Sequence, residues 1–225
     1  MTVRVGFTAW NVVFSERGDG DLRVSSRSPG EPLELVQQRV LELLGVAGVA
    51  VPRQVHGAEM VVVDQPVVGY AVGVGEGDGV VTGVRGVAAA VHVADCLPIA
   101  VGGDGGVAML HGGWRGLSAG IVAEGVGALR ALGAGGALEA VVGPGVGGCC
   151  YETGEEVRQA FAAYGASCGR LLDLKAVAAA QLHQAGVAVV RDVGLCTICA
   201  PAGRLFSHRR DGPATGRQGG FAWLN

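Results

Sequence analysis

The 225-residue sequence has little net charge and no long apolar run. Its 17 Lys and Arg side chains against 20 Asp and Glu give a formal charge of −3, so no strong global field is present to attract nucleic acid or an anionic membrane. No stretch is long and apolar enough to span a bilayer, and the first residues lack the pattern of a secretory signal. We expect a cytoplasmic protein with no nucleic-acid or membrane partner.

Internal repeats and linkers rich in Pro or Ser are also absent, which predicts one domain over residues 1–225. Hydrophobic residues make up 49% of the chain and charged residues 16%, a balance that excludes general disorder. Six cysteines without an export signal are expected to be thiols or metal ligands rather than disulfides.

Short Val-rich runs dominate the first half of the chain, and helical patterns dominate the second half. Strands are predicted at 3–8, 49–55, 60–64, 79–82, 87–93, 97–101, 107–111, 138–143 and 187–191, and helices at 32–45, 117–133, 153–165 and 174–186. This order favours an α/β (α+β) layered sandwich, with a mixed β-sheet and flanking helices.

Two of these helices carry more specific expectations. The helix at 32–45 is predicted to bury Leu33, Val36, Val40 and Leu43 on one face. The helix at 153–165 is predicted to begin with a capping box between Thr153 and Glu156.

Three ligand-type residues stand beside tight turns where predicted strands end: His56, Cys96 and His111. A thiolate and two imidazoles suit zinc, and three protein ligands leave one position open for catalysis. Their separations match no local zinc-finger spacing, so the three can meet only if strand ends converge. Taken one at a time, each could instead be a buried or hydrogen-bonded core residue. His92 is interpreted as structural and as the best substitute ligand.

Two further segments suggest anion and substrate contacts. In HGGWRGL, Trp114 offers a stacking face and Arg115 a forked anion donor, although a core tryptophan and a structural salt bridge are the alternatives. Near the end of the chain, Arg209 and Arg210 lie between apolar segments that would hold them in place, which makes them a candidate anion site.

The remaining cysteines lie in a glycine-rich turn and in one C-x-x-C pair. The turn at 143–148 is expected to expose backbone N–H groups that could hold an anion. Of Cys149 and Cys150, at most one is expected to line a site, because adjacent residues in a strand face opposite ways. Cys196 and Cys199 have no second pair at suitable spacing, so reduced thiols are the expected state.

The motifs RQVHG, ADCLPI, HGGWRG, GPGVGGCCYETGEEV and SHRRDG…TGRQ together resemble the laccase-domain or YfiH-like family, from about residue 50 to the end of the sequence. Members of that family have been described as purine nucleoside phosphorylases and earlier as multicopper polyphenol oxidoreductases. The resemblance implies a YfiH-like fold similar to the cysteine-hydrolase architecture, with His56, Cys96 and His111 as zinc ligands.

The resemblance also implies a zinc-dependent purine nucleoside phosphorylase. Adenosine, inosine, guanosine or methylthioadenosine would react with phosphate to give the free base and the sugar 1-phosphate, and adenosine deamination would be a second activity. Arg115, Arg209 and Arg210 are the candidate phosphate ligands. Asp95 is either a proton donor or the partner that orients a ligand imidazole.

Three alternatives remain open from the sequence. Cys96 could act as a nucleophile with His111 as its base and the 143–148 turn as oxyanion donors, giving an amidase or deamidase, for instance on cell-wall precursors. Copper-dependent phenol oxidation would need several copper ions, and five histidines without a clustered pair fit it poorly. A binding module without turnover is the third.

Overall fold

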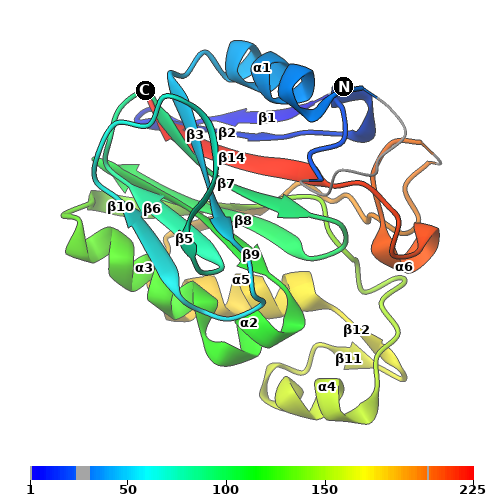
Figure 1. Ribbon diagram of the computed structural model, residues 1–225. Coiled ribbons are helices and arrows are strands. Elements are labelled where there is room, and N and C mark those ends of the chain that lie inside the picture. The colour runs from blue at the N-terminus through cyan, green and yellow to red at the C-terminus, as the bar shows by residue number, and fades with distance from the viewer. Residues whose placement is uncertain (1, 24–30, 202) are drawn as a thin grey trace.

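Two six-stranded sheets stack face to face in the computed structural model, which describes residues 2–23, 31–201 and 203–225 (Figure 1). Across the first sheet the order is β1 (Val3–Gly6), β2 (Trp10–Phe14), β14 (Gln218–Leu224), β7 (Val87–Val93), β3 (Gly48–Arg53) and β5 (Gly69–Glu76). Across the second it is β13 (Val189–Asp192), β10 (Gly135–Val142), β8 (Leu97–Asp104), β9 (Gly106–Gly112), β6 (Gly79–Thr82) and β4 (Met60–Val63). Both sheets mix parallel and antiparallel pairs, which confirms the α/β class.

Helices cover the outer face of each sheet (Figure 1). α1 (Leu33–Leu44) packs on the first sheet, and α2 (Trp114–Ala119), α3 (Ile121–Ala131) and α5 (Leu174–Gln184) pack on the second. The short elements are η1 (Arg17–Asp19), α4 (Glu155–Ala160), η2 (Ala162–Tyr164), β11 (Ser167–Cys168), β12 (Leu171–Leu172) and α6 (His208–Asp211). Among the described residues, no helix is both long enough and apolar enough to cross a membrane.

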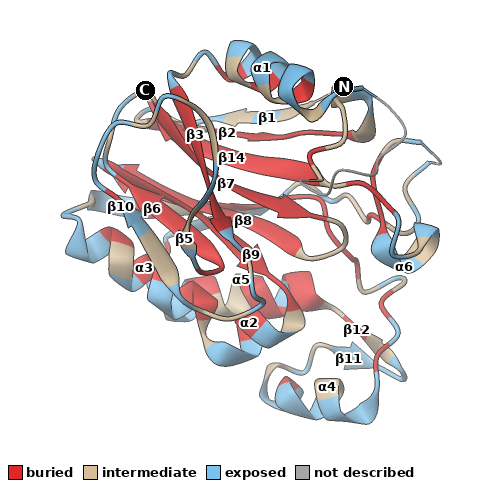
Figure 2. Ribbon diagram, viewed as in Figure 1, coloured by how far each residue is buried: buried red, intermediate tan, exposed pale blue. Residues whose placement is uncertain are grey.

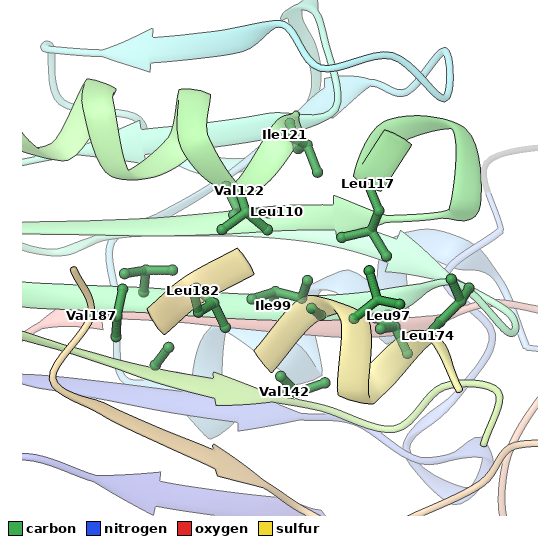
Figure 3. Close-up of a cluster of buried hydrophobic side chains, with 14 of the residues drawn as sticks. Leu97, Ile99, Leu110, Leu117, Ile121, Val122, Val142, Leu174, Leu182 and Val187 are labelled. Carbon is green, nitrogen blue, oxygen red and sulfur yellow. The ribbon is translucent and has the colours of Figure 1, made fainter. Parts of the chain in front are cut away.

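The central strands are buried on both faces, as Figure 2 shows. In β7, Val91 and Val93 point between the sheets, whereas Ala88 and Ala90 point toward α1. In β8 and β9 the alternate residues, such as Ile99, join the helices α2, α3 and α5 in the core drawn in Figure 3. Strands buried on both sides have continuous apolar sequence. Most of them could therefore be predicted from the apolar runs in the sequence.

Several details differ from the sequence expectations. Leu43 is 40% exposed, and Leu44 lies on the buried face of α1 instead. The helix expected at 117–133 is two helices that meet at Gly120, whose φ is +93°. The capping box at Thr153 is wrong, because Gly154 is the N-cap of α4 and the buried Thr153 hydroxyl has no hydrogen-bond partner. Strands β2, β5 and β14 were not expected from the sequence, and the last two are rich in glycine.

Candidate functional site

The ends of three strands converge on His56, Cys96 and His111. His56 follows β3 of the first sheet, Cys96 lies where the chain crosses from β7 to β8 of the second sheet, and His111 lies near the end of β9. One nitrogen from each imidazole and the Cys96 Sγ lie within 4.8 Å of one another. The site therefore sits at one edge of the sandwich, where strand ends from both sheets meet.

Asp78, directly before β6, organises two members of this group. Its side chain is fully buried and accepts a hydrogen bond from His111 Nδ1 at 2.7 Å. The same carboxylate accepts from the backbone N–H groups of Val55, His56 and Gly57 at 3.1, 2.9 and 2.6 Å. The bond to Nδ1 leaves Nε2 as the nitrogen of His111 that is available to a ligand, the arrangement found where a carboxylate orients a metal-binding imidazole.

Backbone strain is concentrated at the same place. Within the described ranges, His56 and Asp95 are the two non-glycine residues with a left-handed φ, at +63° and +86°. Such conformations cost about 1–3 kcal/mol each and persist only where the surroundings enforce them. Asp78 enforces the first, and the side chain of Asp95 is held by Thr197 Oγ1 at 2.6 Å and by the backbone N–H of Arg209 at 2.7 Å.

The group is strongly coupled electrostatically. Burial opposes ionisation of the Cys96 thiol, but His111 and His56 outweigh burial and lower its pKa to about 6. Burial likewise opposes a charge on His111, yet Cys96 and Asp78 raise its pKa above the usual range. The sulfur is thus held toward the thiolate form, the form that binds metals and attacks electrophiles.

These residues fit a metal ion with three protein ligands. The donor set is one sulfur and two ring nitrogens, and the imidazole planes of His56 and His111 meet edge to face at 68°. Cys96 and His111 are recessed, whereas His56 is exposed. The ion would therefore be supported from the protein side and open toward solvent.

A cavity of about 560 Å³ adjoins the open side. His56, Cys96 and His111 line it, and so do three arginines: Arg23, Arg209 and Arg217. A second cavity of about 140 Å³ lies against the same Cys96 and is lined by Trp114, Arg115 and Tyr151. Tyr151 and Asp95 border both cavities, so the ligand group lies between a space lined by three arginines and a smaller one lined by Trp114 and Arg115.

The structure separates the residues that were singled out from the sequence. Trp114 and Arg115 lie at the smaller cavity and stack on each other, with the guanidinium carbon 4.5 Å from the ring centroid. Arg209 lines the larger cavity. Arg210 does not line either cavity: its guanidinium is bonded to the carbonyls of Thr197, Ile198 and Leu205 and to Asp211.

Two other expectations change. Asp78, and not Asp95, is the carboxylate that bonds a ligand imidazole. The turn at 143–148 does not present a row of free N–H groups, because those of Gly143, Gly145 and Val146 donate to protein carbonyls. Its glycine-rich sequence therefore serves close packing rather than anion binding.

His92 stands apart from the ligand group. Its Nε2 accepts the hydroxyl of Tyr70 at 2.8 Å, and burial lowers its pKa to about 4. The site residues that sequence reasoning missed are Asp78, Tyr151, Arg23 and Arg217. An acidic residue directly before a buried strand was the one available signal for Asp78.

The family model for multi-copper polyphenol oxidoreductase laccase matches residues 22–225. The chain belongs to this laccase-like family. The resemblance drawn from the motifs is therefore confirmed.

Curated relatives of this laccase-like chain carry the name purine nucleoside phosphorylase. One from Xylella fastidiosa is 37% identical over 210 residues, covering 85% of this chain and 78% of the relative. One from Streptomyces coelicolor is 40% identical over 182 residues, covering 76% and 73%.

Among solved structures, a Neisseria meningitidis protein of the DUF152 family superposes with a TM-score of 0.81 at 25% identity, covering 100% of this chain and 99% of that one. Bacillus licheniformis YfiH gives the same TM-score at 23% identity, covering 96% and 93%. The expected YfiH-like architecture is thus confirmed.

Proposed function

We propose that this protein is a zinc-dependent purine nucleoside phosphorylase. The observation that carries the proposal is the juxtaposition of an open three-ligand group, His56, Cys96 and His111, with a cavity lined by arginines. The name carried by its curated relatives supports the same reaction class. The substrates we expect are adenosine, inosine, guanosine and methylthioadenosine.

Zinc is the metal that best suits the donor set. One thiolate and two imidazoles are borderline-soft ligands, and three of them around one ion leave a position for substrate. An ion held there would supply Lewis acidity beside the substrate. Asp78 fixes the His111 ring through Nδ1 and fixes the loop that carries His56 through three backbone N–H groups.

The arginines of the larger cavity are suited to phosphate. Arg217 is half-buried, and burial together with the positive charge of Arg23 lowers its pKa. Asp21 pairs with Arg23 at 3.8 Å and offsets part of this repulsion, and an anion between the two guanidinium groups would offset more of it. Arg209 adds a third group from α6, with its guanidinium over the Tyr151 ring at 5.3 Å. We therefore assign phosphate to Arg23, Arg209 and Arg217 rather than to Arg210.

The aromatic side of the site is suited to the purine. Trp114 and Tyr151 line the smaller cavity and offer ring faces for stacking. In phosphorolysis the bond between the anomeric carbon and the base nitrogen breaks, an oxygen of hydrogen phosphate bonds to that carbon, and the base leaves with the electron pair and takes up the proton that the phosphate gives up. Both oxygens of Asp95 already accept protein hydrogen bonds, so we assign Asp95 to positioning Cys96 rather than to proton donation.

Adenosine deamination is the second activity that we propose for the same site. Water adds at C6 of the purine, the bond to the amino nitrogen breaks, and ammonia leaves. This reaction needs no phosphate, so the arginines of the larger cavity would bind no anion during it. It would still use the group formed by His56, Cys96 and His111.

One experiment tests both reactions. Purified protein with its metal content measured is incubated with adenosine, with and without phosphate, and adenine, inosine and hypoxanthine are followed. We expect adenine only with phosphate and inosine in both conditions. The variant His111→Ala should lose the metal bound at His56, Cys96 and His111 and with it both activities, whereas His183→Ala, on the exposed side of α5, should keep them. Phosphorolysis by a His111→Ala protein that has lost the metal of this site would contradict the proposal.

Cysteine catalysis is the second candidate, because the Cys96 thiol lies against two imidazoles. The bonded N–H groups of the 143–148 turn weaken it, since they removed the expected oxyanion donors. Zinc that is lost in His111→Ala, together with failure of an electrophilic amide analogue to trap Cys96, would decide against it. Stoichiometric copper with phenol oxidation would instead support the activity that the family description names.

A further inference from the structure

The structure brings together the four cysteines that the sequence left apart. The sulfurs of Cys149, Cys150, Cys196 and Cys199 lie within 4.8 Å of one another, and all six cysteines of the chain are free thiols. The expectation that at most one of Cys149 and Cys150 faces a site is corrected, because both lie in a turn rather than in a strand. The C-x-x-C pair therefore does have a second pair beside it.

The backbone around Cys196 is arranged to receive negative charge on sulfur. Its Sγ accepts the N–H of Gly147 at 3.3 Å, and the backbone N–H groups of Ile198 and Cys199 in its own turn also favour the thiolate. The turn is closed by the bond from the Ala200 N–H to the Cys196 carbonyl. N–H donors converging on a sulfur stabilise the thiolate that a metal requires.

A glycine lets the two pairs approach. A Cβ on Gly147 would lie 3.2 Å from the Cys149 Sγ and 3.2 Å from the Cys196 Cβ, which is tighter than ordinary van der Waals contact. The parallel bridge between Gly145 and Cys196 fixes the two segments in register. The cluster is thus held by backbone on both sides, with Cys149 and Cys199 exposed and the other two partly covered.

We propose that Cys149, Cys150, Cys196 and Cys199 bind a second zinc ion in a closed, structural site. Tetrahedral zinc with bonds of about 2.3 Å to sulfur places its ligands about 3.8 Å apart. The Cys149 and Cys199 sulfurs are already 3.6 Å apart, so small side-chain rotations complete the tetrahedron. Four thiolates leave no position open for water or substrate, in contrast to the group at His56.

A metal at this site would link the segment that carries Cys149 and Cys150 to the segment that carries Cys196 and Cys199, and both segments lead to the larger cavity. Cys150 precedes Tyr151, and Cys196 precedes Thr197, whose hydroxyl holds Asp95. Arg210 ties the same C-x-x-C turn to α6 through the Thr197 and Ile198 carbonyls. A metal here would therefore stabilise the wall of the functional site without contacting substrate.

Metal content measured on five proteins tests the proposal. Under reducing conditions we expect about two equivalents of zinc in the unaltered chain, about one in Cys199→Ser, about one in His111→Ala and none in the combined variant. Cys168→Ser, an exposed cysteine on β11, is the matched control and should keep both ions. The proposal is independent of the proposed reaction, because zinc is counted whether or not nucleosides are turned over.

A spectroscopic measurement covers the case in which Cys199→Ser does not fold. Cobalt substituted into the His111→Ala protein should give the intense sulfur-to-cobalt charge-transfer absorption of four thiolates in a tetrahedral field. One zinc in the unaltered chain that only His111→Ala removes would overturn the second site. A mass two hydrogens lower, with a disulfide between Cys149 and Cys199, would overturn it as well, and stoichiometric iron would overturn the choice of zinc.

Discussion

The two groups of ligand-type side chains join remote segments by opposite means. His56, Cys96 and His111 lie at the ends of buried apolar strands, which set their positions. The buried carboxylate of Asp78 bonds the His111 ring and the backbone of His56. The four cysteines project from two turns, and a backbone N–H donates to the sulfur of one of them, Cys196. Three ligands beside a cavity leave room for chemistry, whereas four close the coordination sphere. Under the two proposals, the number of protein ligands and the way they are supported, more than their chemical type, distinguish a site open to substrate from a structural site.

Removing Asp78 should have the largest effect, because one carboxylate serves both halves of the first group. Asp78→Ala leaves three backbone N–H groups and His111 without their acceptor. We expect a loss of about 3–5 kcal/mol in the free energy of unfolding and a 10–100-fold loss of metal affinity, by order of magnitude. Urea denaturation and chelator competition measure the two quantities.

The milder variant Asp78→Asn keeps the shape of the side chain but only one carbonyl acceptor, so its effects should fall between those of the alanine variant and the unaltered protein. Asp64→Asn, at an exposed position after β4, should change neither quantity. Unchanged metal affinity in both Asp78 variants would show that Asp78 does not orient the ligands.

Losing the thiolate cluster should lower stability while leaving the first group intact. A metal present at about 100 times its Kd stabilises the folded state by about 2.7 kcal/mol. In a chain of this size that corresponds to a fall in Tm of about 5–11 °C for Cys199→Ser. Differential scanning calorimetry measures the fall. The phosphorolysis rate per remaining zinc, measured below the unfolding temperature, should stay within about twofold of that of the unaltered protein. The reason is that none of the four clustered cysteines lines the cavity at His56.

Burial explains what the sequence could and could not predict. Strands such as β7 and β8 are apolar on both faces and were located from their runs, and His56, Cys96 and His111 were identifiable because each follows or ends such a run. Asp78 has no neighbouring pattern that names its partners, since its role arises from a strand pairing between β6 and β9. The cysteine pairs are joined by a single bridge at Gly145, which no local spacing encodes.

His92, which lines the larger cavity, should make the stability of the protein depend on pH. Its pKa is lowered to about 4 by burial, with a smaller repulsion from Arg217 and an opposing attraction to Asp21, whereas it should be about 6.5 in the unfolded chain. Stability is therefore unaffected above about pH 6.5 and falls as the pH drops toward 4, because only the unfolded chain takes up the proton.

From the difference between the two pKa values of His92, we expect the free energy of unfolding to be about 2 kcal/mol lower at pH 5 than at pH 7. Tyr70 faces the His92 ring and stays protonated, since burial raises its pKa. The measurement is urea denaturation between pH 7 and pH 5. His92→Phe should remove that part of the slope, and His183→Gln should not; equal slopes in all three proteins would contradict the assignment.

The smallest effect should come from the hydroxyl that connects the two groups. Thr197 is fully buried, and its Oγ1 donates to Asp95 at 2.6 Å. Thr197→Val keeps the shape of the side chain and removes the hydrogen-bond donor, so we expect the free energy of unfolding to fall by about 1–2 kcal/mol. Because Asp95 holds a left-handed φ next to Cys96, kcat should fall while KM changes little, and Thr197→Ser should restore kcat. Loss of stability with an unchanged kcat would confine Thr197 to packing and would separate the two groups energetically.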